Sequence, residues 1–327
     1  MKKLFLVIVI AILVLSACAS FGAKVQTGPL QTLRLPMGFI PNVQYAPFYV
    51  AVERGYFAEA GFEIEFDYSF ETDGVALVGA GELPFAVVSG EQVLLARAQE
   101  IPVVYVAAWF QDYPVAVVAK KSSGITTAQD LVGREIGLPG LFGANYIGLR
   151  AMLGEVGITE EEVELDSIGF NQIEALNADQ DDAVVVYVNN EPIQLEAQGV
   201  EINVFPVADY VQLAANGLIS NEHTLLDDPE MVRAFIGAFL RGLEDTIADP
   251  DAAYEISKDF VVGLAEADEG VQRQVLARSI ELWRADVLGV SDPAAWENMQ
   301  NVLLGMGLLN EALDLNAAYS NEFLPAN

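Results

Sequence analysis

The chain of 327 residues contains a single cysteine, Cys18, and a single histidine, His223. One cysteine cannot form a disulfide within the chain, and no thiol nucleophile follows position 18. The same count excludes a zinc site built from histidine and cysteine. A Ser-His-Asp triad would have to use His223, which lies in the polar segment 220–224 and looks like part of a surface loop. The sequence therefore predicts no catalytic residue of these kinds.

Basic residues are also scarce: 16 lysines and arginines stand against 47 aspartates and glutamates, for a formal net charge of −31. Nucleic-acid binding is excluded, because neutralising phosphates requires basic patches. Anionic lipid headgroups would also repel such a surface. The acids leave a carboxylate site open, yet no calcium-loop pattern of alternating Asp or Asn with a closing Glu occurs. We therefore expect neither a metal ion nor a cofactor.

Only one long apolar run is present, and it lies at the N-terminus. Met1-Lys2-Lys3 is followed by the almost entirely aliphatic residues 4–15 and then by Ser16-Ala17-Cys18. A basic start, an apolar run and small residues at the cut are typical of a secretory signal. The run is too short to span a bilayer comfortably, which takes about 20 residues. The sequence Leu15-Ser16-Ala17-Cys18 resembles the lipobox of bacterial lipoproteins.

That resemblance implies that residues 1–17 are a signal peptide and that Cys18 becomes the mature N-terminus, carrying a diacylglycerol. Residues 18–30 would form a tether, and the protein would be lipid-anchored at the cell membrane, facing the periplasm or the cell exterior. The alternative is an ordinary signal peptide that contains a cysteine by chance. About 310 residues remain after cleavage, enough for two lobes of ordinary domain size.

Strand and helix patterns alternate over much of the remaining chain. Residues 62–66 alternate strictly between apolar and acidic side chains, as in a strand with one wet face, whereas 83–88 and 183–188 are continuous apolar runs. This order predicts an α/β protein with mostly parallel sheets. Two lobes are favoured over an eight-stranded barrel, because only helices are expected from residue 228 onward, at 228–248, 250–262, 267–285, 292–305 and 311–323.

In open α/β sheets a ligand lies beyond the carboxyl ends of the strands, and this rule selects candidate binding residues. Several of them are aromatic or amide side chains and none is basic, whereas a dedicated anion site would normally include arginine or lysine. Backbone amides at a helix start can bind an anion alone, and residues 143–145 could do so. The candidates are Asn42, Gln44, Tyr45, Ser89, Glu91, Trp109, Phe142, Asn145, Tyr146, Tyr187, Asn189 and Glu191.

Several segments together resemble one known family, the NMT1/THI5-like substrate-binding proteins of ABC importers (the SsuA/THI5 superfamily). The resemblance covers roughly residues 33–250. It is carried by Met37-Gly-Phe-Ile-Pro-Asn-Val-Gln-Tyr-Ala-Pro-Phe-Tyr-Val-Ala51 with Glu53-Arg-Gly-Tyr-Phe57, and by the segments 77–81, 89–92, 130–133 and 187–192.

The resemblance implies a type II periplasmic-binding fold, in which two α/β lobes are joined by two crossover segments and the ligand lies in the cleft between them. Lobe one would comprise residues 31–117 and 215–327, and lobe two residues 118–214. The crossovers would fall near 115–119 and 206–213. The partners implied are an inner-membrane ABC permease with its ATPase and a small-molecule ligand.

Aromatic rings combined with amides suit a flat, mostly neutral heteroaromatic ligand, because rings stack on its faces and amides read its polar edge. This disfavours the sulfonate, nitrate and taurine branches of the superfamily. An aminopyrimidine precursor of thiamine would pair with a carboxylate such as Glu191. Riboflavin would present its imide edge to amides such as Asn42, Gln44 or Asn189. The resemblance favours riboflavin, while the residues by themselves leave both open.

Each candidate also has a purely structural interpretation. Trp109 and Tyr187 could be core aromatics at strand ends, Phe142 a loop plug, and Glu191 an acid favoured by the helix dipole. Asn42 is expected to contact ligand in preference to Phe39, because an amide in a loop gains less from the core.

Two other functions compete with capture for import. Eukaryotic relatives of the family make the thiamine pyrimidine with a histidine and a cysteine-rich motif of their own, and this chain has neither near the candidate residues. An extracytoplasmic sensor would usually be fused to transmembrane and signalling segments. We therefore expect a binding protein that does not alter its ligand.

Overall fold

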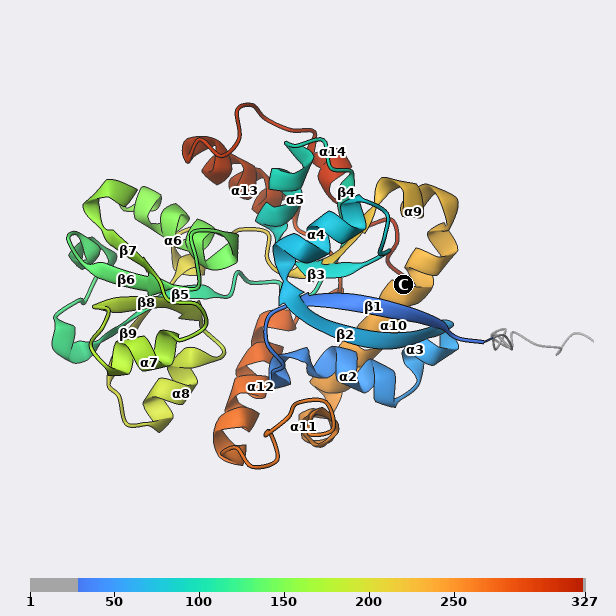
Figure 1. Cartoon of the computed structure of the whole chain (residues 1–327), viewed down its shortest axis with the longest axis horizontal. Coiled ribbons are helices and arrows are strands. Elements are labelled where there is room, and N and C mark those ends of the chain that lie inside the picture. The colour runs from blue at the N-terminus through green and yellow to red at the C-terminus, as the bar shows by residue number, and fades with distance from the viewer. Residues whose placement is uncertain (1–28, 326–327) are drawn as a thin grey trace, which may run out of the picture.

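The computed structural model describes residues 29–325, which form two α/β bodies side by side (Figure 1). The predicted signal peptide, Cys18 and most of the predicted tether lie outside the described residues. One body holds the chain up to β4 and everything from β10 onward, and the other holds β5 to β9. No helix within 29–325 combines the length and apolarity needed to cross a membrane.

The first body begins with two parallel strands, β1 (Gln31–Gly38) and β2 (Phe62–Phe70), joined through α2 (Ala46–Glu53) and α3 (Tyr56–Glu59). The alternation predicted at 62–66 is present, since Phe62 is buried and Glu63 is exposed. Next come α4 (Glu71–Gly79), β3 (Ala86–Val88), α5 (Gly90–Arg97) and β4 (Val103–Ala108). Strands β3 and β4 are fully buried, as their continuous apolar sequences predict.

The second body is built on a five-stranded sheet in the order β7-β6-β8-β5-β9. Its strands are β5 (Val115–Lys120), β6 (Glu135–Leu138), β7 (Glu164–Ser167), β8 (Ala183–Tyr187) and β9 (Ile202–Pro206). Its helices are α6 (Gly143–Glu155), α7 (Gln172–Asn177) and α8 (Glu191–Ala197).

The chain passes between the two bodies twice, and the two passages touch. Residues 109–114 lead from β4 to β5, and residues 207–216 lead from β9 to β10 (Gly217–Asn221). The backbone amides of Trp109 and Phe110 both donate to the carbonyl of Asn216, at 3.1 and 3.0 Å. The first passage precedes the segment 115–119 in which a crossover was expected, because those residues form β5 between β8 and β9. The lobe limits at 117/118 and 214/215 stay a prediction.

The expectation of mostly parallel sheets is wrong. Strand β10 pairs antiparallel with both β3 and β4, and β5 pairs antiparallel with both β8 and β9. Only the pairs β1–β2, β6–β7 and β6–β8 are parallel among the described strands. The antiparallel pairs arise where the chain enters a sheet from the other body, so a pattern of local alternation does not reveal them.

Strand β10 also corrects the expectation of a surface loop at 220–224. Ser220 and Asn221 are buried on the strand, where their side chains donate to the carbonyls of Pro84 and Val78. His223 follows on α9 (Glu222–Asp227), with an exposed side chain near Asp227. The sequence gives no sign of this strand, because its partners β3 and β4 lie more than a hundred residues earlier.

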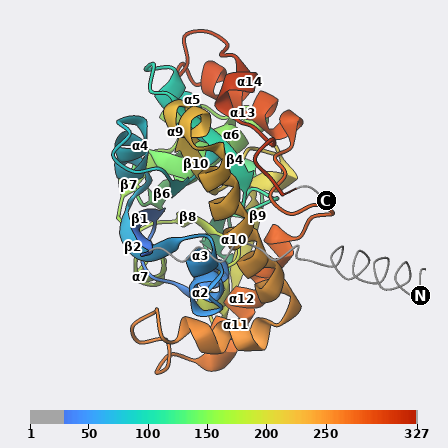
Figure 2. The same ribbon diagram turned by 90° about the vertical axis from the view of Figure 1, so that its right-hand side faces the viewer.

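The C-terminal helices pack onto the first body, as Figures 1 and 2 show. They are α10 (Pro229–Ala248), α11 (Pro250–Ser257), α12 (Glu269–Trp283), α13 (Pro293–Gly305) and α14 (Leu315–Ala318). Helix α10 lies so close to α2 that a Cβ at Gly242 would stand 2.2 Å from the carbonyl oxygen of Pro47. The helix expected at 311–323 is only the single turn α14, because Tyr319 is extended and bridges to Tyr105 on β4.

Candidate functional site

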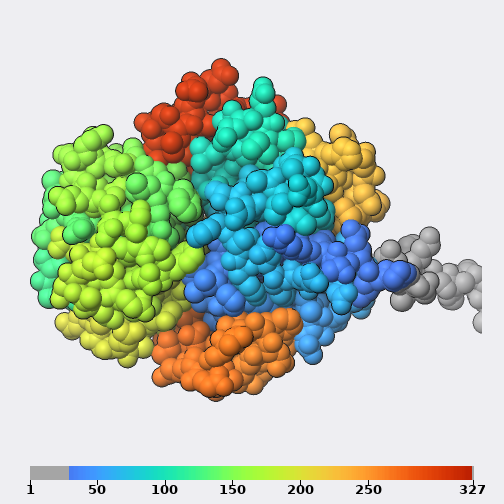
Figure 3. Space-filling view, viewed as in Figure 1, coloured from blue at the N-terminus to red at the C-terminus, as the bar shows by residue number. Residues whose placement is uncertain are grey.

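A cavity lies between the two bodies, where they meet along the seam between green and blue atoms in Figure 3. Together with the solvent-open space at its mouth it has a volume of about 900 Å³. None of its lining residues is basic. They are Met37, Gly38, Phe39, Gln44, Tyr45, Phe70, Glu71, Thr72, Val87, Gln92, Trp109, Phe110, Pro139, Phe142, Gly143, Ala144, Asn145, Phe170, Gln172, Tyr187, Asn190, Glu191 and Asn216.

One wall of the cavity is aromatic. Tyr45 and Trp109 are stacked, with ring centroids 5.4 Å apart and an angle of 30° between their planes. The Tyr45 hydroxyl donates to the carbonyl of Met37 at 2.7 Å, which fixes its ring. Trp109 is 3% exposed, and its indole Nε1–H has no acceptor among the described residues. A buried indole N–H normally has a partner, which the described residues do not supply here.

The mouth of the cavity carries four phenylalanines, two from each body. Phe39 packs edge-on against Phe170, with centroids 4.8 Å apart. The ring centroid of Phe70 lies 5.9 Å from those of both Phe142 and Phe170. The side chains of Phe70 and Phe142 are about half exposed. Large exposed apolar side chains that gather around a hollow are typical of a binding site.

Two carboxyl groups of the first body share one serine hydroxyl. Ser89 Oγ lies 2.6 Å from Glu71 Oε2 and is also hydrogen-bonded to Glu91 Oε1. A serine hydroxyl has one hydrogen, so it can donate to only one of the two carboxyls and must accept from the other. At least one of these carboxyls is therefore protonated.

The electrostatics agree with a shared proton. Burial, reinforced by the nearby charge of Glu91, raises the pKa of Glu71 to about 8. Burial also raises the pKa of Glu91, whose Oε2 is buried without a partner among the described residues. Because Glu71 lines the cavity, it presents a carboxyl group that is neutral over most of the physiological range.

Asn216 extends this network across the passage between the bodies. Its Nδ2 donates to Glu71 Oε1 at 3.0 Å, and its Oδ1 accepts from the hydroxyl of Tyr187 at 3.0 Å. Burial raises the pKa of Tyr187 well above its ordinary value, so the phenol remains a neutral donor. Hydrogen bonds thus link five side chains in one series between the two bodies, which we call the polar floor: Tyr187, Asn216, Glu71, Ser89 and Glu91.

The second body supplies acceptors to the cavity. Asn145 Nδ2 and Gln172 Nε2 both donate to the carbonyl of Val185, at 2.9 and 3.3 Å, which leaves their side-chain oxygens to accept from a ligand. Glu191 begins α8 and accepts from the backbone N–H of Tyr187 at 3.0 Å and from Asn190 Nδ2 at 2.8 Å. Burial raises the pKa of Glu191.

The structure brings seven of the twelve predicted site residues to the cavity, namely Gln44, Tyr45, Trp109, Phe142, Asn145, Tyr187 and Glu191. The others lie elsewhere. Asn42 caps the short turn 43–45 by accepting from the backbone N–H of Gln44, so Phe39 lines the cavity instead of Asn42, contrary to expectation. Tyr146 points away and donates to Glu160 at 2.7 Å.

The remaining three support the site from behind it. Ser89 and Glu91 belong to the carboxyl network. Asn189 is fully buried, and its Nδ2 donates at 2.7 Å both to Gln44 Oε1 and to Ser279 Oγ on α12, which fixes the Gln44 side chain.

Sequence reasoning did not select Glu71, Asn216, Gln92, Gln172, Phe70 or Phe170. Glu71 follows β2 directly, so the strand-end rule would have selected it had β2 been extended from residue 66 to residue 70. Asn216 carries no local signal, since it stands between two elements whose partners are distant in sequence.

Comparison with known proteins identifies a family and several relatives. The family described as NMT1/THI5 like matches residues 42–253. The chain is 40% identical over 304 residues to the riboflavin-binding protein RibY of Chloroflexus aurantiacus, covering 90% of this chain and 87% of that protein. It is 28% identical over 324 residues to the formylaminopyrimidine-binding protein of Halalkalibacterium halodurans, covering 96% and 97%.

Enzymes are also among the relatives. The 4-amino-5-hydroxymethyl-2-methylpyrimidine phosphate synthase of Legionella pneumophila is 27% identical over 300 residues, covering 89% of this chain and 92% of that protein. Among solved structures, the alkanesulfonate-binding protein SsuA of Xanthomonas axonopodis pv. citri superposes with a TM-score of 0.71 at 14% identity, covering 90% and 100%. The fold is thus that of the periplasmic binding proteins, as expected.

Proposed function

The chain belongs to the NMT1/THI5-like family, and from this premise we propose that it captures riboflavin for an importer. The observation that carries the proposal is the cavity between the two bodies, which joins an aromatic wall to a polar floor and has no basic lining residue. A flat, uncharged ring system needs an aromatic face and polar partners at its edge, whereas a sulfonate or phosphate site would normally include arginine or lysine. The relative with 40% identity is named as a riboflavin-binding protein, which supports the same ligand.

The polar groups offer the donors and acceptors that an isoalloxazine ring requires. Its imide edge has one N–H donor between two carbonyl acceptors. Each oxygen of the Glu71 carboxyl already has one hydrogen bond, to Ser89 or Asn216, and keeps a further lone pair that can accept from the imide N–H. The indole N–H of Trp109 has no acceptor among the described residues. The ring of Trp109, stacked on Tyr45, supplies a face for packing. The side-chain oxygens of Asn145 and Gln172 can accept from ribityl hydroxyls.

An aminopyrimidine is the second candidate ligand. Glu191 is the observation in its favour, because this buried carboxyl at the cavity edge could pair with a ring nitrogen and an exocyclic amine. The relative that binds formylaminopyrimidine shares 28% identity. Both oxygens of Glu191 already accept hydrogen bonds, from Tyr187 N–H and Asn190, just as both oxygens of Glu71 are bonded to Ser89 and Asn216.

We further propose that the ligand leaves the protein unaltered. The single histidine is exposed on α9 and does not line the cavity, and the single cysteine lies at position 18. The carboxyls in the cavity could transfer protons, but neither histidine nor cysteine stands among the lining residues. This chain would therefore share the fold of the synthase relatives without catalysing their reaction.

The place of action follows from the same proposal. A solute-binding protein delivers its ligand to a permease, and the N-terminal sequence 1–18 would export the chain and anchor it through a lipid on Cys18. The partner would be an ABC permease with its ATPase. Two lobes, residues 31–117 with 215–327 and residues 118–214, would close on the ligand as a hinge.

The test is a titration of the mature protein with riboflavin, followed by the fluorescence of the flavin. Stacking on Trp109 or Tyr45 should quench the fluorescence, and the titration should saturate at one flavin per chain. The dissociation constant should lie below 1 µM, which corresponds to a binding free energy of about −8 kcal/mol or stronger. A parallel thermal-shift screen contains an aminopyrimidine. Absence of quenching together with stabilisation by the aminopyrimidine would transfer the assignment to the second ligand.

A further inference from the structure

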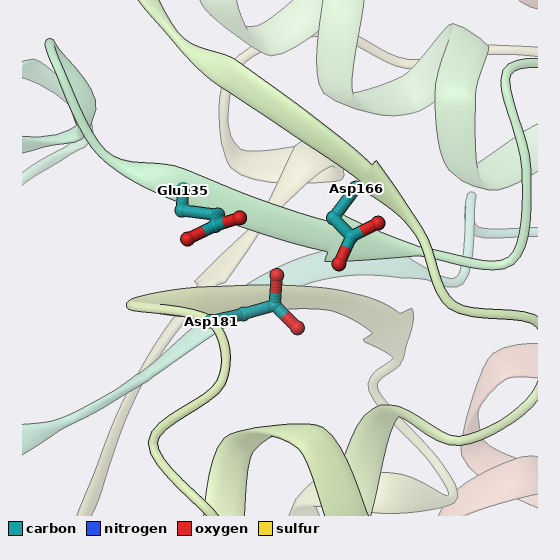
Figure 4. A group of neighbouring side chains, drawn as sticks. All are labelled: Glu135, Asp166 and Asp181. Atoms are coloured by element: carbon teal, nitrogen blue, oxygen red, sulfur yellow. The ribbon is translucent and has the colours of Figure 1, made fainter.

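Three carboxyl groups meet on the sheet of the second body, away from the cavity. They belong to Glu135 at the start of β6, Asp166 on β7 and Asp181 just before β8 (Figure 4). One oxygen atom from each lies within 4.8 Å of the others. Figure 4 shows the Asp181 carboxylate directed between the other two.

Asp181 is the unusual member of this group. Asp181 is only 3% exposed, and neither of its carboxylate oxygens has a hydrogen-bond partner among the described residues. Buried carboxylates in proteins are normally paired, hydrogen-bonded or bound to a metal, because an isolated buried charge is very costly. The polar groups of Asp181 thus point to a partner that the chain itself does not supply.

The sheet makes room for this carboxylate. Gly137 lies two residues after Glu135 on β6 and pairs with Asp166 on β7. A Cβ at Gly137 would stand 2.5 Å from Asp181 Oδ2. Any side chain at that position would therefore displace Asp181 from the space between the other two acids.

The groups around the cluster do not neutralise it. Gln180 Nε2 donates to Asp166 Oδ2 at 3.1 Å. The guanidinium of Arg134 lies 3.5 Å from Asp182 and forms no ion pair with the three acids among the described residues. Asp182 adds further negative charge and accepts from the backbone N–H of Glu135 at 3.3 Å.

We propose that Glu135, Asp166 and Asp181 bind one calcium ion. The ligands are all carboxylate oxygens, which hard cations prefer, and zinc would call for histidine or cysteine. Calcium accepts oxygen ligands at about 2.4 Å in flexible geometries, whereas magnesium requires a near-octahedral set at about 2.1 Å. Backbone carbonyls and water would complete the coordination. Such a site would replace the expectation of no metal, which rested on the scarcity of histidine and cysteine and on the absence of a contiguous calcium loop.

The ion would join β6, β7 and the entrance to β8, and so would stabilise the second body without touching the cavity. The experiment uses the mature protein, treated with a chelator and then exchanged into buffer of constant ionic strength. Calcium binding is measured by isothermal titration calorimetry, and thermal unfolding by circular dichroism with and without calcium or magnesium. We expect one site per chain with a dissociation constant of about 10⁻⁴–10⁻³ M or tighter, and a melting temperature that rises saturably with calcium and less with magnesium.

Three variants separate this site from the general attraction of calcium to an acidic surface. Asp181→Asn should lose one calcium per chain and the thermal shift, and should itself fold, since it removes an unpaired buried charge. Glu135→Gln, at an exposed position, should weaken binding at least tenfold and serves as the second test. Glu155→Gln, an exposed acid on α6 in the same body, should behave as the wild type.

The proposal is overturned if the wild-type protein shows no site tighter than about 10 mM. It is equally overturned if Asp181→Asn and Glu135→Gln bind calcium with the same stoichiometry and affinity as the wild type. In either case a proton shared among the three carboxyls, and not a metal ion, neutralises the cluster.

Discussion

The hydroxyl of Tyr187 at the end of β8 donates to Asn216 Oδ1 at 3.0 Å, and the same amide donates to Glu71 at 3.0 Å. Tyr187 belongs to the five-stranded sheet, whereas Glu71 begins a helix of the other body. A single side chain on the passage between them therefore connects the polar groups of both halves of the cavity. Its removal should affect ligand binding more than its size would suggest.

We expect Asn216→Ala to weaken riboflavin binding about five- to tenfold, a loss of about 1–1.4 kcal/mol. The variant leaves the Tyr187 hydroxyl and Glu71 Oε1 without their partner, so both groups are no longer held in position. Titration calorimetry measures the change. Asn177→Ala is the matched control, because Asn177 is exposed and bonds only to Gln198 among the described side chains. Equal affinities for the two variants would remove Asn216 from the site.

Trp109 should provide the main stacking surface for the ligand. We expect Trp109→Ala to weaken riboflavin binding at least tenfold, about 1.4 kcal/mol. The variant also loses core packing, at a cost of about 3–5 kcal/mol in unfolding free energy. Trp296→Ala provides the control, because Trp296 is equally buried but stacks on Tyr319, outside the cavity. It should lose stability and keep its affinity. An affinity unchanged in folded Trp109→Ala would make Trp109 a core residue only.

The raised pKa of Glu71 predicts that the stability of the fold depends on pH. Its pKa in the folded state is about 8, above the ordinary value of 4.5 that applies to the unfolded chain. Between these two values the folded protein holds a proton that the unfolded chain has lost. The stability from this group is therefore fully present below pH 4.5 and is lost as the pH rises through 8.

Melting temperatures recorded by circular dichroism from pH 6 to pH 9 test this dependence. The melting temperature of the wild type should fall more steeply over this range than that of Glu71→Gln, whose amide imitates the neutral acid. Glu155→Gln, an exposed acid, should follow the wild type. Parallel curves for wild type and Glu71→Gln would show that Glu71 titrates normally.

Part of this arrangement could be predicted from the sequence, and the reason differs from element to element. The buried strands at 103–108 and 183–187 are continuous apolar runs, which depend only on local composition. Trp109 and Tyr187 follow directly from the strand-end rule, because each stands at or just after the carboxyl end of its strand. The proline at the first turn of α10, α11 and α13 marked three helix starts.

The rest depends on contacts between distant segments. The role of Glu71 comes from Ser89 and Asn216, which are 18 and 145 residues away, whereas locally it looks like an ordinary acid at a helix start. Phe39 lines the cavity where Asn42 was expected, and the Asn42 side chain instead caps the next turn. The calcium candidates come from three separate segments, so no sequence motif brings them together.

Helix packing in the first body gives a prediction that is independent of ligand. Gly242→Ala should destabilise the protein by about 1–3 kcal/mol, because the added Cβ would collide with the backbone of α2 at Pro47. Gly154→Ala on α6 has nothing within 4 Å of the added Cβ and should be neutral or stabilising by up to about 1 kcal/mol. Urea unfolding measures both free energies. Destabilisation of equal size in the two variants would contradict the close approach of α10 to α2.

The central claim, that the cavity holds a flat and uncharged vitamin, is tested most directly by the crystal structure of the protein with riboflavin. We predict one flavin between the two bodies, with its ring against Trp109 and its imide edge within hydrogen-bonding distance of Glu71. A flavin bound elsewhere, or a cavity that takes up only a small anion, would contradict the account.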